Sequence, residues 1–407
     1  MQWSMRWAAV MVAAASVAVA TPAAHAGPWT PVDNGMVDTS RPSLSLRKST
    51  TTIVWTTPDG ELVTRPVSAK GTLRSSRVLQ RGWNYLSVDP VRAGTEYVAA
   101  GTRAVPGSSL YWPGAAFATD GGGLVTLTDD FAYLSQGQDA TMVDGRLLYA
   151  YTDGGSALQV ASLGLPTAQI SLGTAQEPAL ATDGGATYVG WFAQGAGLLL
   201  SEVSVPPGAL TVAPPVIAPA SLYASPTQRV ALVVRKGQPW TAYQSAARQI
   251  SLWRPGRTTP VQIATKDPVV AVDLAVAGSR LWIAYATNKQ VCVQRSAANA
   301  VVFGAATCRS AAASAVALAA GEYADVVATV APKALHTRLL PSVSVTTRPR
   351  SGAVVVRDAG RPVAKARVTV GTQKGRTNAA GRVRLDPWPK KQTVQVDAEG
   401  YERWSSR

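Results

Sequence analysis

The stretch Gly278–Val293, GSRLWIAYATNKQVCV, reads as a turn, an apolar strand, a second turn and a second strand. The first strand is apolar on both faces, because Trp282, Ala284 and Tyr285 alternate with other apolar residues. Such a strand lies between neighbouring sheets instead of facing water. One sheet cannot bury both of its faces alone, so this stretch predicts several sheets stacked on one another.

Variants of this unit recur along the chain, and each opens with a glycine. The opening glycines are Gly145, Gly185, Gly237, Gly278 and Gly321, spaced by 40, 52, 41 and 43 residues. A repeat of roughly 40–50 residues built from short strands is typical of a β-propeller. At about 45 residues per blade, residues 27–341 predict about seven blades, and six or eight also fit the spacing.

The first part of the chain repeats less clearly. Hairpins are predicted from strands at 51–56 and 61–67, at 83–88 and 96–99, and at 123–128 and 131–135. Gly82 and Gly122 are 40 residues apart, as in one blade, but only 23 residues separate Gly122 from Gly145. Either this blade is incomplete or one of these glycines is a wrong anchor.

Two further segments have a predicted place in the ring. The Ala-rich run Ser310–Gly321 is interpreted as a strand, because the repeat needs an outgoing strand there. A strand near Val32–Leu46 is predicted to complete the last blade and close the ring.

The N-terminus has the pattern of a secretory signal. Arg6 is its only charge, Trp7–Ala20 is an apolar run too short to span a bilayer, and a small-x-small site ends at Ala26 before Gly27. No later run of about 18 apolar residues follows. We therefore predict cleavage after residue 26 and a secreted, extracellular protein.

The cysteines agree with export. Cys292 and Cys308 are the only two and lie 16 residues apart. In an oxidising compartment two cysteines most often form a disulfide, worth about 3 kcal/mol by the chain-entropy argument.

The segment Ala181–Tyr188, ATDGGATY, resembles the Asp-box of sialidase-type propellers, with Ala in place of Ser and Tyr in place of Trp. The resemblance covers eight residues. It implies a structural hairpin around Asp183, supports a propeller and says nothing about sialidase activity.

The composition changes after Pro341, where residues 342–350 are predicted to be a linker. Residues 351–401 contain Asp-x-Gly-x-Pro-Val from Asp358, a turn and strand from Thr377 to Leu385, and a closing Ala-x-Gly-Tyr that ends at Tyr401. This segment resembles the carboxypeptidase regulatory-like domain, which implies a transthyretin-like β-sandwich over residues 351–407. The resemblance also implies an accessory module beside another domain.

Catalytic sites are hard to build from these residue types. The two histidines are His25 in the signal and His336, which is too few for a zinc site and leaves a Ser-His-Asp triad dependent on one residue. The carboxylates mostly flank Gly or Pro in predicted turns: Asp33, Asp38, Glu61, Asp129, Asp130, Asp144, Asp183 and Asp273. We predict no catalytic residue, no metal and no cofactor.

The repeat places six aromatic residues where inter-blade packing is favoured over sugar stacking. They are Tyr151, Trp191, Trp240, Tyr243, Trp282 and Tyr285. Trp29, Trp112, Trp388 and Trp404 are the better candidates for the surface.

The strongest candidate binding region is the basic C-terminus. The chain carries a formal net charge of +15, and residues 342–407 hold 14 Lys and Arg against five Asp and Glu. Strand alternation predicts that valines face the core and basic residues face solvent. The predicted patch comprises Lys365, Arg367, Arg376, Arg382, Arg384, Lys390 and Lys391.

These observations predict a secreted, all-β, non-enzymatic binding or scaffolding protein at the cell surface. Arginine binds phosphate and carboxylate in a bidentate way, so an anionic cell-wall polymer, a polysaccharide or extracellular nucleic acid is the expected partner, without base-specific recognition. A basic surface that only keeps the protein soluble is the competing interpretation. The alternative function is a glycan-active enzyme, of glycoside hydrolase or lyase type, with its site on the propeller axis.

Overall fold

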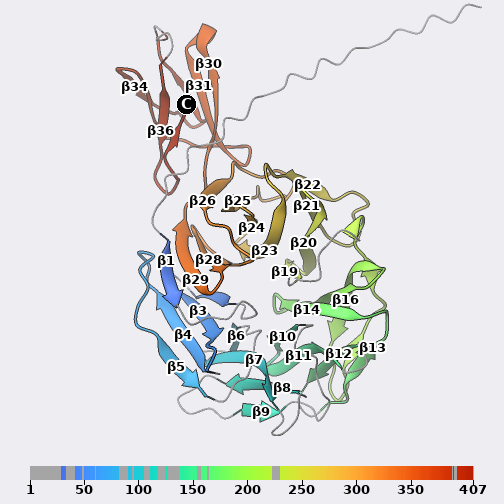
Figure 1. Cartoon of the computed structure of the whole chain (residues 1–407). Helices are drawn as coiled ribbons and strands as arrows, with labels where there is room; N and C mark the ends of the chain where they lie inside the picture. Colours follow the sequence, from blue (N-terminus) through green and yellow to red (C-terminus); the bar gives the residue numbers. More distant parts are fainter. Residues whose placement is uncertain are drawn as a thin grey trace, which may run out of the picture.

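The computed structural model describes residues 29–33, 42–47, 50–59, 61–81, 90–93, 96–104, 111–117, 124–126, 137–153, 157–162, 165–221, 230–386, 388 and 392–406. Within these, residues 30–339 form seven antiparallel sheets around a central axis, and residues 344–405 form two more sheets beside the ring (Figure 1). The protein is all-β, with an N-terminal propeller and a C-terminal β-domain. In the described part of the chain, no helix has the length and apolarity needed to cross a membrane. The predicted signal and its cleavage site lie outside the described residues.

In each of the first six blades, the strands follow one another in sequence order from the axis to the outer edge. Their strands are β2 (Ser43–Arg47), β3 (Thr50–Thr56), β4 (Leu62–Val67), β5 (Arg77–Gln80); β6 (Pro90–Ala93), β7 (Glu96–Ala104), β8 (Tyr111–Phe117), β9 (Leu124–Thr126); β10 (Gln138–Val143), β11 (Arg146–Thr152), β12 (Leu158–Ser162), β13 (Ala168–Ile170). They continue with β14 (Ala175–Thr182), β15 (Thr187–Ala193), β16 (Gly197–Ser204), β17 (Thr211–Val212), β18 (Val216–Ile217); β19 (Ala231–Arg235), β20 (Gln238–Ala246), β21 (Gln249–Trp253), β22 (Val261–Ala264); β23 (Val269–Ala277), β24 (Arg280–Thr287), β25 (Gln290–Arg295), β26 (Thr307–Ser310).

The seventh blade joins the two ends of the propeller. It consists of β27 (Ala315–Ala320), β28 (Ala324–Val330), β29 (Lys333–Leu339) and, as its outermost strand, β1 (Thr30–Asp33). β1 pairs antiparallel with β29. Closure by the N-terminal segment is therefore confirmed. The closing strand is shorter than predicted, because the chain must return to the axis and begins the first blade with β2.

The unit at Gly278–Val293 forms the predicted elements, with Gly278 in the turn between β23 and β24. The anchors Gly82 and Gly122 lie outside the described residues, and the first turn of the second blade follows Ala93, between β6 and β7. A glycine marks many kinds of turn and does not identify the first turn of a blade. With that turn as anchor, the second blade has all four strands. β7 pairs with β6 and β8, so the strand predicted at 83–88 is not its partner; the strand predicted at 131–135 lies outside the described residues.

The Ala-rich run contains a strand, as predicted, but its place in the blade differs. β27 is the first strand of the seventh blade and lies beside the axis, whereas an outgoing strand was expected. Small side chains fit there, since the first strands of all blades converge on the axis.

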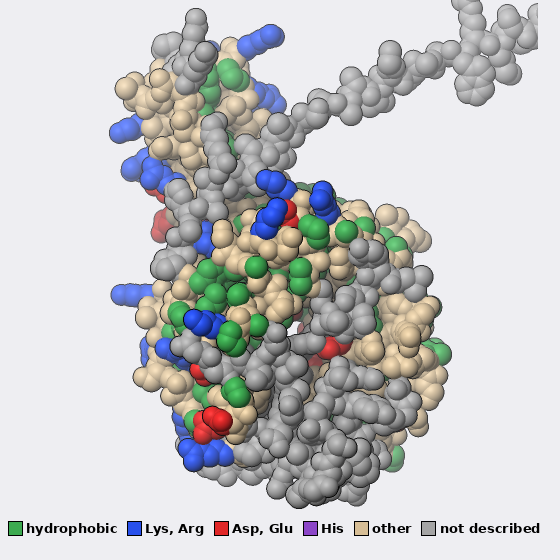
Figure 2. Space-filling view, viewed as in Figure 1, with side chains coloured by type: hydrophobic (Ala, Val, Ile, Leu, Met, Phe, Trp, Pro, Cys, Tyr) green, Lys and Arg blue, Asp and Glu red, His purple; other side chains and the backbone are tan. Residues whose placement is uncertain are grey.

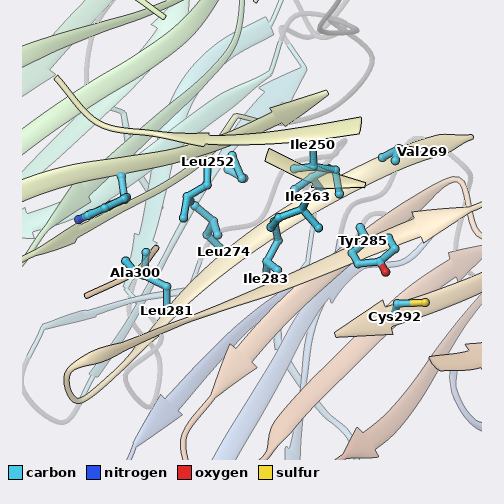
Figure 3. Close-up of a cluster of buried hydrophobic side chains, with 14 residues drawn as sticks. Ile250, Leu252, Ile263, Val269, Leu274, Leu281, Ile283, Tyr285, Cys292 and Ala300 are labelled. Atoms are coloured by element: carbon cyan, nitrogen blue, oxygen red, sulfur yellow. The ribbon is translucent and has the colours of Figure 1, made fainter. Parts of the chain in front are cut away.

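The propeller core lies between blades. One cluster combines Ile250 and Leu252 of the fifth blade with Leu274 and Ile283 of the sixth (Figure 3). All six aromatic residues expected to pack between blades are at most 5% exposed, which confirms that prediction. Cys292 and Cys308 are direct partners on β25 and β26 and form the predicted disulfide.

The C-terminal domain is a two-layer structure. One sheet contains β30 (Ser344–Arg348), β31 (Ala353–Asp358), β32 (Arg361–Pro362) and β35 (Arg382–Arg384); the other contains β33 (Arg367–Val370), β34 (Gln373–Arg376), β36 (Val394–Asp397) and β37 (Trp404–Ser405). Valines of both sheets, among them Val354, Val368 and Val396, form one buried cluster.

Two predictions about this domain are wrong. The linker predicted at 342–350 is largely strand, because β30 pairs with β31 along its whole length, and the short 3-10 helix Pro349–Ser351 connects them. Trp404, expected at the surface, is 5% exposed in the shared core, because its strand is the last of the second sheet.

Candidate functional site

The described residues of the predicted basic patch are all exposed. Lys365, Arg367, Arg376, Arg382 and Arg384 face solvent, while Val368, Val370 and Leu385 are buried, as strand alternation requires. Lys390 and Lys391 lie outside the described residues. The exposed residues are distributed over two sheets, because β33 and β34 belong to one sheet and β35 belongs to the other, with β34 next to β35 at one edge.

A first basic face covers the outer side of the sheet that contains β31. It comprises Arg348, Arg357, Arg382 and Arg384, all exposed. Arg348 of β30 and Arg384 of β35 are the two cross-strand partners of Ala353, one on each side of β31. Arg382 of β35 is the partner of Val355. Sequence reasoning missed Arg348 and Arg357. The alternation of apolar and polar residues within 353–358 could have identified Arg357. Arg348 was missed because residues 342–350 were interpreted as a linker.

A second basic face covers the outer side of the sheet that contains β33. It comprises Arg367, Lys374, Arg376 and Arg403, all exposed. Arg367 and Arg376 are direct cross-strand partners, and Arg403 donates a hydrogen bond from Nη2 to Oε1 of Gln395 at 2.7 Å. Asp397 lies opposite Arg367 on the other side. Like charges directly opposite each other in a sheet are destabilising, so this arrangement costs some stability.

Two acidic residues of the domain are engaged by the propeller. The Asp358 carboxylate accepts hydrogen bonds at Oδ2 from Arg280, from Arg295 at 2.6 Å and from the Tyr401 hydroxyl at 3.2 Å. Glu402 accepts a hydrogen bond from Arg309 at 2.8 Å. The guanidinium of Arg295 also lies 5.3 Å from the ring centre of Trp282 and 5.5 Å from that of Tyr401.

This interface fixes the domain on the sixth blade by one end. Asp358 ends β31, and Tyr401 and Glu402 lie between β36 and β37. The outer sides of the two sheets remain uncovered by the ring, and both Figure 1 and Figure 2 show the domain projecting beyond it. The engaged acids neutralise propeller arginines and leave the domain's own basic residues with few counter-charges.

A groove of about 890 Å³ runs between the sixth and seventh blades. Its lining includes Trp282, Tyr323, Glu322 and the same Arg280 and Arg295 that bind Asp358. These two cations are thus committed to the interface between the domains.

The propeller axis holds a channel of about 470 Å³ lined by the first strands of six blades. Two carboxylates in this channel, those of Asp139 and Asp273, each accept two hydrogen bonds from backbone N–H groups. Asp139 accepts hydrogen bonds from the N–H groups of Ala140 and, in the next blade, Leu180 (2.7 and 2.6 Å). Asp273 accepts them from Leu274 and Leu318 (2.8 and 2.7 Å).

The axial carboxylates therefore join neighbouring blades. Burial raises the pKa of the Asp139 carboxyl well above its usual value, against the lowering effect of its two backbone hydrogen bonds. Asp139 is 1% exposed and lines the channel, and the charge of Asp273 adds to the rise in the pKa of its carboxyl.

Other residues singled out in the sequence also have structural partners. Asp183 accepts hydrogen bonds from Gly185 and Ala186 in its own hairpin and from Gly237 in the next blade. His336 is 1% exposed and lies 3.0 Å from the Asp325 carboxylate. Among the described residues, His, Cys, Asp and Glu form no group of three or more that could hold a metal ion.

Comparison with known proteins supports the propeller alone. No family model matches the chain, and no curated protein resembles it in sequence. The BP39L lectin of Burkholderia pseudomallei is similar in structure, with a TM-score of 0.54, 13% identity, and coverage of 79% of this chain and 97% of the lectin. BBS1N, solved in complex with ARL6DN, has a TM-score of 0.51 and 11% identity, covering 79% of this chain and 98% of its own. At these identities the similarity shows the fold.

Proposed function

We propose that this is an exported, non-enzymatic binding protein of the cell surface, whose C-terminal domain binds an anionic cell-wall polymer or polysaccharide. The observation that carries the proposal is the outward placement of arginines on the C-terminal sheets, combined with the engagement of Asp358 and Glu402 by the propeller. Guanidinium groups form bidentate hydrogen bonds with carboxylate or phosphate, and repeated groups on a polymer match repeated arginines on a sheet.

Export is supported by two independent features. The N-terminal 26 residues have the charge, length and cleavage pattern of a secretory signal. The disulfide between Cys292 and Cys308 is of the kind that persists in oxidising compartments.

The propeller has the role of a scaffold in this proposal. Its sixth blade holds the C-terminal domain through Arg280, Arg295 and Arg309. A lectin among the structural neighbours agrees with a binding role for such a ring, although its ligand does not transfer to this chain. The resemblance of residues 351–401 to carboxypeptidase regulatory-like domains, which are accessory modules, points the same way.

The test is binding of the full-length exported protein to immobilised polygalacturonate, which carries carboxylates, and to a polyol-phosphate polymer. Binding should occur to at least one of them, and raising the salt from about 0.05 M to 0.5 M should weaken it at least ten-fold, because exposed charges are screened. A variant with all eight residues of the two basic faces changed to Ser should lose binding.

The matched control removes eight exposed cations from the propeller instead, which gives the same net charge. The residues changed to Ser are Lys70, Arg74, Arg146, Lys236, Arg248, Lys266, Lys289 and Lys333. Equal loss of binding in this control would mean that net charge alone is responsible and would refute the proposed site. Binding to duplex DNA but to neither polymer would refute the proposed ligand class.

A further inference from the structure

We propose that the C-terminal domain binds two anionic polymer strands at once, one on each basic face, and so cross-links them. This inference rests on the proposed function, because it concerns the same polymer. The sequence predicted one patch, and the structure distributes its residues over two separate surfaces.

The two faces point in opposite directions. Val354 of β31 and Leu385 after β35 are buried against Val368 and Val396 of the other sheet. Neighbouring residues alternate in direction along a strand, so Arg382 and Arg384 point away from the core on one side, and Arg367 and Arg376 point away on the other.

Each face is an array suited to a repeating anion. On the first face, Arg348 and Arg384 lie in one row across three strands, about 10 Å apart at the backbone, and Arg382 lies about 7 Å along the strand from Arg384. On the second face, Lys374 and Arg376 have the same spacing along β34, and Arg367 faces Arg376. A bound anion between Arg367 and Arg376 would relieve the repulsion between them.

The faces are separated by the thickness of the domain except at one edge. Packed sheets are about 10 Å apart, and the arginine side chains extend outward from both of them. At the edge where β34 lies next to β35, the two backbones come within 8 Å of each other. Since the domain is docked by one end, polymer strands can approach both faces.

The test compares the wild-type protein with two variants, in which either the first or the second basic face is changed to Ser at its four positions. Titration with a short oligogalacturonate or a short polyphosphate at low salt should saturate at two oligomers per wild-type chain and at one for each variant. Mixing with the long polymer should give turbidity for the wild type, and each variant should reduce it at least ten-fold while it still binds the immobilised polymer.

The outcomes separate the two proposals. If the wild type binds neither oligomer nor polymer, the proposed function fails and the inference fails with it. If one variant loses all binding and the other keeps both full binding and turbidity, a single face is responsible; the proposed function then stands and cross-linking is refuted. Conservative variants with Lys at Arg367 and Arg376, or at Arg382 and Arg384, should retain turbidity, which distinguishes loss of charge from damage to the fold. Light scattering of the protein alone checks that turbidity does not come from self-association.

Discussion

At the level of single residues, the Asp325 carboxylate ties the seventh blade to the first. It is fully buried and accepts hydrogen bonds from Arg338 at 2.8 and 2.7 Å and from Thr51 of the first blade, with His336 at 3.0 Å. Burial raises the pKa of Asp325, but these hydrogen bonds outweigh it and hold the pKa below its usual value.

Replacement of Asp325 by Asn should lower the free energy of unfolding by about 3–5 kcal/mol, because it leaves the Arg338 cation without its partner in a buried site. A carboxyl with a lowered pKa stabilises the fold above its unfolded pKa of about 3.9 and loses this effect as the pH falls through its folded pKa. Denaturant unfolding should therefore show a constant difference between wild type and variant from pH 7 to about 4, and a smaller one in more acidic solution. The exposed carboxylate of Asp386 provides the control, since Asp386→Asn should have no measurable effect. A variant as stable as wild type at pH 7 would contradict this role.

The predictable residues were those whose placement is decided locally. Arg367, Arg382 and Arg384 could be assigned to the surface because each alternates with apolar neighbours. The partners of Asp358 could not be predicted, because Arg295 and Arg280 lie 63 and 78 residues away in sequence. No pattern within the C-terminal segment refers to them.

At the level of elements, β1 closes the ring with few residues. Val32 is 3% exposed against Ile53 and Trp55 of the first blade, and Asp33 accepts a hydrogen bond from Nε1 of Trp55. The strand also covers the outer edge of β29, which would otherwise expose unpaired backbone groups.

Deletion of residues 29–33 should lower the melting temperature of the propeller by at least about 5 °C, because the loss of buried Val32 and the β29 pairing amounts to a few kcal/mol. Differential scanning calorimetry provides the measurement. A synthetic peptide of residues 27–34 should restore part of the loss when added in excess. An unchanged melting temperature would show that the ring does not depend on β1.

The elements that sequence reasoning placed correctly have both a turn and an apolar run. The unit at Gly278–Val293 and the pair β3 and β4 are of this kind. The second blade was misplaced because glycines outside its first turn were used as anchors. The spacing of glycines in the sequence defines the period of the repeat. It does not define which strands pair, because pairing depends on the neighbouring strand along each edge.

At the level of the whole molecule, docking and polymer binding should differ in their response to salt. The docking charges are mostly buried: side-chain exposure is 16% for Arg280, 13% for Arg295 and 2% for Asp358. Salt screens exposed charges far more than buried ones. We therefore expect high salt to release the polymer while the C-terminal domain stays on the sixth blade.

Replacement of Asp358 by Asn should release the domain from the ring, since it leaves Arg280 and Arg295 facing a neutral group in a largely buried interface. Loss of one partner from such a network costs about 3–5 kcal/mol. Small-angle scattering should show a larger radius of gyration, and proteolysis near residues 340–343 should become faster.

Asp386→Asn is the control: it is the same substitution in the same domain, but Asp386 is 72% exposed and 3.6 Å from Arg384. If Asp358→Asn leaves scattering and proteolysis unchanged, contacts such as that of Arg309 with Glu402 hold the domain instead. If the domain is released but its two basic faces still bind polymer, docking positions the binding module and takes no part in binding itself.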